Sequence, residues 1–160
     1  MIHPAVAHFG MVLPIIALIL GIAYLIKPSE LMSKISTRFM VFASIFLIIA
    51  FFTGKSDGSE AYILLSAEGK ATLLEHKDLG LYLAIAMVLA SLVKMYGCIK
   101  NNLKAEIFAV LLLGIITSGV LYQGKMGGEL TYTYGANVEK YSDGMDCLEE
   151  QAEFSEEEDE

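Results

Sequence analysis

The chain is 160 residues long, and 55% of these residues are hydrophobic while only 19% are charged. A soluble domain averages roughly 45–50% apolar and about 25% charged residues. The excess of apolar residues is concentrated in a few segments, which excludes a soluble globular enzyme. The last twenty residues hold ten of the 19 acidic residues and none of the 11 basic ones, so the rest of the chain carries a formal charge of +2. Without a basic stripe that could replace the counterions of phosphates, nucleic acid is excluded as a partner.

The apolar segments are long enough to cross a membrane. A bilayer core of about 30 Å requires roughly 20 residues of helix, at a rise of about 1.5 Å per residue. Each segment is nearly free of ionisable side chains: the first holds only His8, and Lys94 and Glu106 lie near the ends of the third and fourth. We expect an all-α fold, an integral membrane four-helix bundle within residues 1–140, with spans at residues 4–26, 37–54, 77–96 and 105–123.

The first span is expected to be retained rather than cleaved. Signal peptides begin with a positively charged region and have a shorter apolar core. No Lys or Arg precedes residue 27 here, so this segment has the features of a membrane helix.

The segments between and after the spans give three further expectations. Residues 55–75 contain a short apolar run that predicts a helix lying at the interface between spans two and three. Thr131 to Tyr134 favour extended structure after the fourth span. Residues 141–160 are rich in like charge and poor in apolar residues, which predicts a disordered acidic tail. Glu106 is expected to be a solvated acid at a helix start.

Basic residues set the expected orientation. Cytoplasmic loops are enriched in Lys and Arg. The segments 27–38 and 94–104 hold six bases between them, more densely than the loops on the opposite face. We therefore expect these two segments in the cytoplasm and both termini outside it.

All three histidines lie near the outer ends of the expected spans. His8 lies more than one turn inside the first span, where an ionisable group usually faces the bundle interior. His76 begins the third span at a comparable depth. Two neutral imidazoles on opposed helices are the usual ligands of a b-type haem in a bundle. His3 lies five residues before His8, about 140° around a helix, and is expected chiefly to cap the first helix.

Other residues near these histidines are consistent with a cofactor. Gly80 lies one turn deeper than His76 on the same face and leaves space for a macrocycle. Met11 is an alternative soft metal ligand, and His3 is a further candidate ligand. Lys77 and Lys125 are candidates for pairing with haem propionates. The sequence has no CxxCH motif, so covalent c-type attachment is excluded.

Three functions remain open from the residues. The first is a small b-type haem protein that moves electrons near the outer membrane surface, with the acidic tail attracting a basic soluble electron carrier. The second is a transition-metal or proton-handling membrane protein that uses the same histidines, and this one requires a homo-oligomer for transport. The third is a cofactor-free accessory subunit of a larger respiratory complex, in which the histidines only fix helix packing. No nucleophile–base pair or phosphate loop is present, so an enzyme acting by itself is not expected.

The first nine residues also resemble a known family. The stretch from Ile2 to Phe9, Ile-His-Pro-Ala-Val-Ala-His-Phe, is similar to the opening of the bacterial membrane family called domain of unknown function 2231. Thr53-Gly54, His76 and the run from Gly127 to Tyr132 followed by Gly135 resemble its other signatures, over residues 2–138. The resemblance implies a four-helix protein of the bacterial inner membrane with paired outer histidines, and it implies no settled activity.

Two positions depart from the family pattern. Gly10 stands where the family has a proline. Tyr134 precedes Gly135 where a histidine is common, which removes one potential additional ligand.

Overall fold

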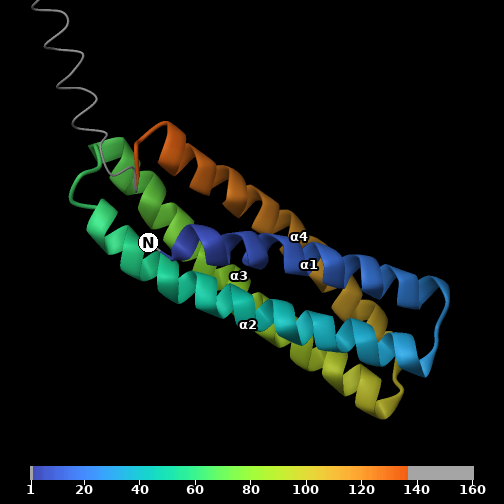
Figure 1. Ribbon diagram of the computed structural model, residues 1–160. Coiled ribbons are helices and arrows are strands. Elements are labelled where there is room, and N and C mark those ends of the chain that lie inside the picture. Colours follow the sequence, from blue (N-terminus) through green and yellow to red (C-terminus); the bar gives the residue numbers. More distant parts are fainter. Residues whose placement is uncertain (1, 137–160) are drawn as a thin grey trace, which may run out of the picture.

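The computed structural model describes residues 2–136, and this part of the chain forms four long helices (Figure 1). All four are long and apolar enough to cross a membrane. No strand occurs among residues 2–136, so the all-α expectation is confirmed. The helices are α1 (His3–Ile26), α2 (Glu30–Ala61), α3 (Ala67–Lys100) and α4 (Leu103–Tyr132).

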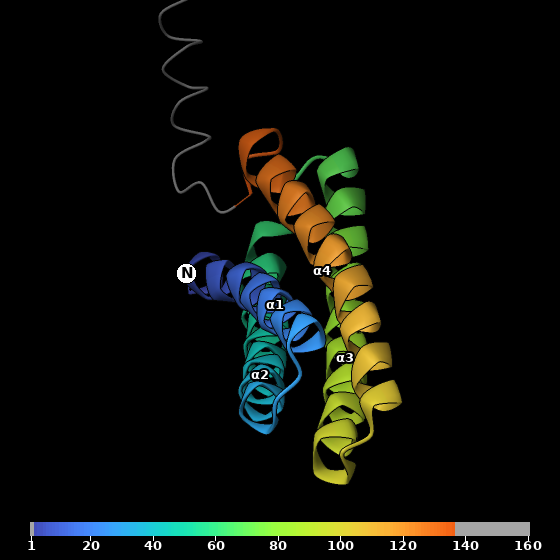
Figure 2. The same cartoon turned by 90° about the vertical axis from the view of Figure 1, so that its right-hand side faces the viewer.

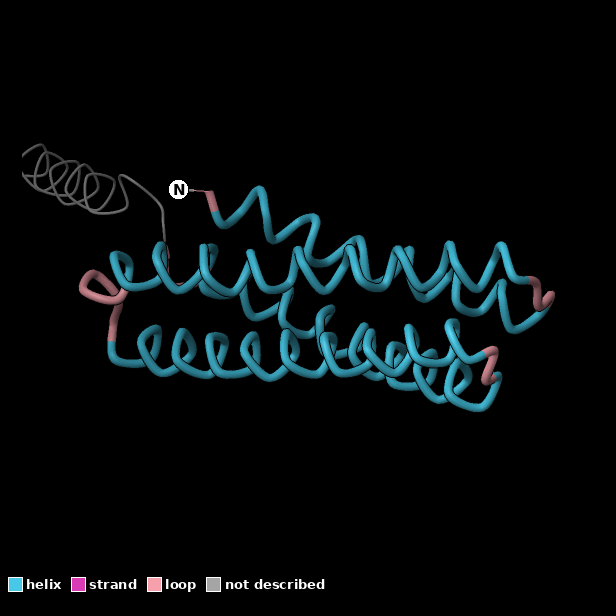
Figure 3. Tube along the Cα trace, turned by 90° about the horizontal axis from the view of Figure 1, so that it is seen from below, coloured by secondary structure: helices cyan, strands magenta, loops and turns pink. Residues whose placement is uncertain are grey.

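The helices form a ring in which each packs against two others. Helix α1 contacts α2 and α4, and α3 contacts α2 and α4 (Figure 2). Only short loops join them (Figure 3). The start of α1, the turn at residues 62–66 and the end of α4 lie together at one end of the bundle, which we call the histidine end (Figure 1). The turns at residues 27–29 and 101–102 lie at the other, which we call the far end.

Polar side chains begin three of the helices. Ser29 Oγ accepts a hydrogen bond from the Met32 backbone N–H at 3.2 Å, and Ser66 Oγ accepts one from the Gly69 N–H at 3.2 Å. Asn102 Oδ1 accepts from the Ala105 N–H at 3.2 Å. These bonds satisfy N–H groups that have no partner inside a helix. Asn101 ends α3 in the left-handed region at φ 48°, a conformation that asparagine tolerates better than most residues.

The helices extend further than the hydropathy indicates, and two expectations about the connections are wrong. Helix α2 continues to Ala61 and α3 begins at Ala67, so the expected separate interfacial helix within residues 55–75 does not exist. Helix α4 continues through Tyr132, so Thr131 to Tyr134 are not a strand. Hydropathy reports which residues face lipid, whereas a helix continues wherever the backbone bonds and a packed neighbour support it. The expected acidic tail at residues 141–160 lies outside the described residues.

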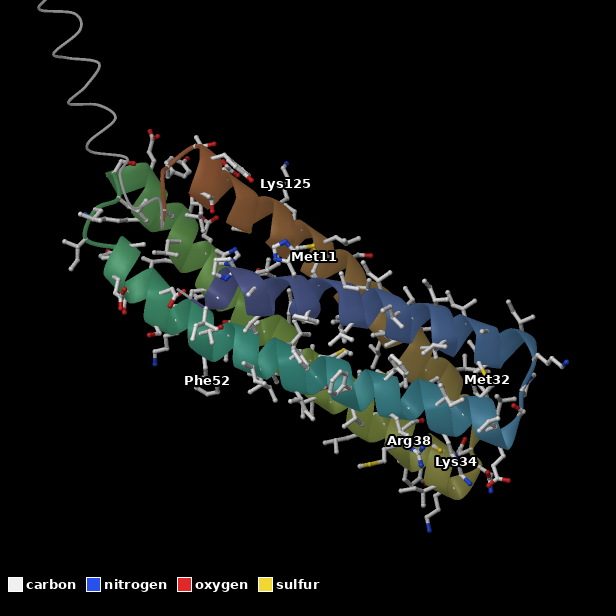
Figure 4. The ribbon with its side chains drawn as sticks, in the orientation of Figure 1. Met11, Met32, Lys34, Arg38, Phe52 and Lys125 are labelled. Atoms are coloured by element: carbon white, nitrogen blue, oxygen red, sulfur yellow. The ribbon has the colours of Figure 1, made fainter. Side chains whose placement is uncertain are left out.

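The interior of the bundle contains closely packed apolar side chains, while large apolar side chains also cover the outside. Met40, Ala43 and Met87 are at most 1% exposed. Phe52, by contrast, is 63% exposed and points away from the bundle (Figure 4), and Ile115 is 71% exposed. An apolar outer surface of this extent is expected of helices that face lipid.

A second, smaller apolar cluster closes the histidine end. Ala61 and Leu65, around the α2–α3 turn, pack with Leu130 and Ala136 from the end of α4. Gly135 adopts φ 66°, a conformation that side chains rarely allow. The segment after α4 therefore folds back as a turn onto the bundle.

Candidate functional site

A cavity of about 1050 Å³ lies at the histidine end. Residues from all four helices line it, and they include all three histidines. Ligand pockets in proteins usually have volumes of about 300–1000 Å³, so this cavity has room for a cofactor. The sequence predicted that the histidines gather at one end, and the structure places them on one cavity.

His3 does more than cap α1. Its ring packs on Gly54 of α2, where an added Cβ would lie 2.8 Å from His3 Cε1. Its Nδ1 lies 3.2 Å from Thr53 Oγ1, and its backbone N–H donates to Asp57 Oδ2 at 3.2 Å. These contacts hold the ring against α2, and its other nitrogen, Nε2, also lies beside Gly54, 3.1 Å from the position of an added Cβ.

His8 lies on the rim of the cavity rather than in the bundle interior. The side chain is exposed, which corrects the expectation that it faces inward. The bundle encloses the cavity at this depth, so the face of α1 that carries His8 borders the cavity. His8 Nδ1 donates a hydrogen bond to the Pro4 carbonyl oxygen at 2.6 Å. A neutral imidazole protonated at Nδ1 has a free lone pair on Nε2, which is the atom a metal binds.

His76 is half-buried in α3 and faces both α1 and α4. The ring lines the same cavity as His3. A Cβ at Gly127 of α4 would lie 3.4 Å from His76 Cε1, so a glycine there admits the ring. Within residues 2–136, the buried His76 Nδ1 has no hydrogen-bond partner. A buried polar atom without a partner costs about 1–3 kcal/mol, so this site retains a polar group that its own fold does not satisfy.

The sequence reasoning missed Gln123. This side chain of α4 donates from Nε2 to the His76 carbonyl oxygen at 2.7 Å. A Cβ at Gly80 would lie 3.0 Å from Gln123 Nε2, so the space beside Gly80 holds this amide rather than being open for a macrocycle. Gln123 Oε1 is the other buried side-chain atom without a partner in the described part of the chain.

Met11 of α1 also lines the cavity, where it packs against α4. A Cβ at Gly124 would lie 3.1 Å from the Met11 sulfur. The thioether therefore packs on the α4 backbone beside the histidines. It remains a soft group next to the candidate ligands.

The two lysines chosen from the sequence have different positions. Lys77 is exposed and lines the cavity. Lys125 is exposed, points away from the bundle (Figure 4) and is not among the cavity-lining residues. Lys55 of α2, which the sequence did not single out, does line the cavity.

The far end holds a buried ion pair that corrects the expectation for Glu106. Glu106 of α4 is 2% exposed rather than solvated, and it pairs with Lys94 of α3, which is 1% exposed. Tyr24 of α1 donates its hydroxyl to Glu106 Oε1 at 2.9 Å. Ser33 of α2 donates to both carboxylate oxygens, at 3.0 and 2.9 Å. Each helix thus contributes one side chain to a network that we call the far-end network: Tyr24, Ser33, Lys94 and Glu106.

Lys94 is consequently not a loop residue. It lies inside α3, and its Nζ is 4.5 Å from the centre of the Tyr24 ring. The orientation prediction therefore depends on the exposed bases that remain at the far end, which are Lys27, Lys34, Arg38, Lys100 and Lys104. These residues still favour placing the far end in the cytoplasm.

Fold and cavity together define a membrane-embedded four-helix protein with a histidine-lined cavity at one end. The chain belongs to the family described as Predicted membrane protein (DUF2231), whose model matches residues 1–140. The resemblance noted from the motifs is thereby confirmed. No curated protein and no solved structure matches the chain.

Proposed function

We propose that this chain is a small membrane-embedded b-type haem protein that moves electrons near the outer surface of the bacterial inner membrane. The observation that carries the proposal is that His3, His8 and His76, from two helices, line one cavity, and that the buried His76 Nδ1 has no partner within residues 2–136. A buried group that the fold leaves unsatisfied is often part of a functional site.

The number of available donors favours a haem over a bare metal ion. Within residues 2–136, no three side chains of His, Cys, Asp or Glu come together in a way that could hold a metal. Protein sites for transition-metal ions usually supply three or four ligands. A porphyrin supplies four nitrogens itself and needs only axial ligands from the protein. A pair of imidazoles is therefore sufficient for haem and too few for most free ions.

The chain's own residues would hold the group as follows. His76 from α3 and either His3 or His8 from α1 would bind the iron. Lys55 and Lys77, which line the cavity, would pair with the propionates. The deeper wall consists of apolar side chains, which would exclude water from the ring: Leu47, Phe51, Leu83 and Val120. When bound, the haem would supply a one-electron redox couple.

The acidic tail supports a role in electron transfer. Ten acidic residues in the last twenty positions create a negative field that would attract a basic soluble electron carrier. Such steering raises association rates at low ionic strength. The tail follows α4, which ends at the histidine end, so a steered carrier would arrive beside the cavity.

The test is an absorption spectrum of the detergent-solubilised chain from haem-replete cells, first oxidised and then reduced. We expect a Soret band in the wild type, and loss of this band in His76→Ala. Whichever of His3→Ala and His8→Ala also loses the band identifies the second ligand. Thr131→Val is the matched control, because Thr131 lines the cavity while its hydroxyl donates only to the Gly127 carbonyl. A colourless wild-type protein would overturn the proposal.

The other two candidate functions give different results in the same preparation. A transition-metal protein would contain stoichiometric Cu, Zn or Fe without porphyrin. A proton-handling protein would contain no metal and no porphyrin, and its proton transport would depend on the histidines. An accessory subunit would co-purify with a respiratory complex, and histidine replacement would leave the activity of that complex unchanged.

A further inference from the structure

His3 of α1 is attached to α2 by contacts with three neighbouring residues of that helix. Its backbone N–H donates to Asp57 Oδ2 at 3.2 Å, and its Nδ1 lies 3.2 Å from Thr53 Oγ1. An added Cβ at Gly54 would lie 2.8 Å from Cε1, 3.0 Å from Nδ1 and 3.1 Å from Nε2 of the ring. Distances this similar mean that the face of the ring covers the glycine. The contact with Gly54 therefore does not involve the ring edge that carries the Nε2 lone pair.

The hydroxyl of Thr53 indicates which nitrogen of this ring carries the proton. Thr53 Oγ1 donates to the backbone carbonyl oxygens of Ile49 at 3.0 Å and Ala50 at 3.1 Å. A hydroxyl has one proton and two lone pairs, and a carbonyl oxygen only accepts. If Nδ1 of His3 lacked a proton, three acceptors would surround a single hydroxyl proton. If Nδ1 carries the proton, it donates to a lone pair of the hydroxyl, which keeps its own proton for the carbonyls.

This arrangement prepares the other nitrogen for a metal. A neutral imidazole protonated at Nδ1 has its lone pair on Nε2. A histidine that binds a metal almost always donates its other N–H to an oxygen acceptor, which fixes the tautomer and the ring orientation. The two nitrogens lie on opposite sides of the ring, so Nε2 of His3 faces away from the Thr53 hydroxyl.

We infer that Thr53 is the positioning residue for His3: its hydroxyl accepts the Nδ1–H of His3, so that His3 Nε2 is the ligand that binds the haem iron together with His76. This inference rests on the haem-binding function proposed above and selects between its two candidate ligands on α1. Helix α2 thereby takes part in the site without supplying a ligand.

His8 offers the same tautomer with less support. Its Nδ1 donates to the Pro4 carbonyl oxygen of its own helix at 2.6 Å, and its side chain is exposed. His3 is half-buried and is held by a second helix. A side chain that is already ordered loses less conformational entropy on binding, which favours His3 as the ligand.

The alternative is that Thr53 only helps to join α1 to α2, and this role makes no demand on the ring proton. The position of the proton therefore separates the two roles, and it can be measured without haem. The experiment is nitrogen NMR of the haem-free full chain with isotope-labelled histidines, at alkaline pH where the rings are neutral. The spectrum distinguishes a ring nitrogen that carries a proton from one that does not. The signals of His3 are those that His3→Ala removes.

In the wild type we expect the His3 proton on Nδ1. Thr53→Val keeps the shape of the side chain without its hydroxyl, so we expect part of the His3 population to carry the proton on Nε2 instead. Thr53→Ser retains a hydroxyl and should restore the wild-type tautomer. The control Thr131→Val removes a cavity-lining hydroxyl that donates to the Gly127 carbonyl and should match the wild type.

Haem binding to the same variants connects the tautomer to the ligand. In Thr53→Val we expect an affinity for haem about 10- to 100-fold weaker, the loss usual for such partners, while Thr53→Ser and Thr131→Val should bind like the wild type. His3→Ala should lose the Soret band, and His8→Ala should keep it.

The outcomes distinguish the inference from the function on which it rests. A wild-type His3 with its proton on Nε2 would overturn the inference whether or not haem binds. A Soret band that survives in His3→Ala and is lost in His8→Ala would overturn the inference and leave the haem function intact. A wild type that binds no haem would overturn both. If Thr53→Val does not fold, the wild-type tautomer and the comparison of His3→Ala with His8→Ala decide, because neither requires that variant.

Discussion

The two ends of the bundle differ in whether their buried polar groups have hydrogen-bond partners. At the far end, the Glu106 carboxylate has a donor from each of the other three helices, and the network is closed and almost fully buried. At the histidine end, a cavity of about 1050 Å³ separates the helices, and two buried polar atoms have no partner within residues 2–136. Polar side chains join helices at both ends, but only at the histidine end does the described part of the chain leave buried side-chain atoms without a partner.

This difference is what the proposed binding function requires. Sites that bind ligands commonly lose stability in exchange for function, because their groups are placed for a partner rather than for each other. A satisfied buried network, by contrast, makes the local arrangement specific. Substitutions should therefore destabilise the far end and alter binding at the histidine end.

The largest effect should come from breaking the buried ion pair on one side. Lys94→Met leaves the Glu106 carboxylate buried without its cation, which typically costs about 3–5 kcal/mol. Denaturant unfolding in detergent measures this loss. The double variant Lys94→Met/Glu106→Gln should recover most of it, because no uncompensated charge remains. If the free energy of unfolding of Lys94→Met lay within about 1 kcal/mol of the wild-type value, the ion pair would not stabilise the far end.

Removing one neutral donor from the same carboxylate should have a smaller effect. Tyr24→Phe keeps the ring beneath Lys94 and deletes only the hydroxyl that donates to Glu106 at 2.9 Å. Hydrogen bonds to charged groups contribute about 1.5–3 kcal/mol. Tyr82→Phe is the matched control, since Tyr82 is 68% exposed and should change nothing. Equal unfolding free energies for Tyr24→Phe and Tyr82→Phe would contradict the account.

The same glycine substitution at the two ends sharpens the comparison. A Cβ at Gly97 would lie 2.6 Å from Glu106 Cγ and 3.0 Å from the Glu106 backbone nitrogen, so Gly97→Ala should cost about 1–3 kcal/mol by overpacking. The three atoms nearest a Cβ at Gly54 all belong to the His3 ring, at 2.8 to 3.1 Å. Because the close contact is with a side chain that can shift rather than with backbone, Gly54→Ala should cost less stability than Gly97→Ala and should weaken haem binding. A Gly54→Ala variant that unfolds as easily as Gly97→Ala would contradict this difference.

The smallest effect on stability should come from the histidine itself. His76→Leu replaces a buried nitrogen that has no partner in the described part of the chain by an apolar side chain. The haem-free variant should therefore be as stable as the wild type or more stable by about 1 kcal/mol. His8→Leu, on the exposed rim, is the comparison variant and should be neutral. Unfolding measurements on the haem-free proteins test this. A clear loss of stability in His76→Leu would mean that the imidazole has a structural role.

Much of the fold follows from the sequence. The four spans are visible because hydropathy marks the residues that face lipid, and the gathering of His3, His8 and His76 follows because consecutive helices alternate in direction. The ends of the helices could not be predicted in the same way. Residues such as Ser56 and Asp57 are polar and still helical, because backbone bonding continues where the lipid ends.

The contacts between helices are the part that the sequence did not reveal. Glu106 and Lys94 are the ionisable groups near the facing ends of two successive spans, and intramembrane charges usually pair. That signal could have found the ion pair. Gln123 carries no comparable signal, because its contact with His76 depends on the rotation and axial register of α3 against α4, which hydropathy does not encode.

The most direct test of the contrast between the two ends is the shift in unfolding midpoint when haem is added to haem-free protein. A ligand that binds only the folded state stabilises it by about 2.7 kcal/mol at a concentration one hundred times its dissociation constant. We predict that haem raises the midpoint of the wild type and of Tyr24→Phe by the same amount, and that it leaves His76→Leu unchanged. No shift in the wild type, or an equal shift in His76→Leu, would contradict the account.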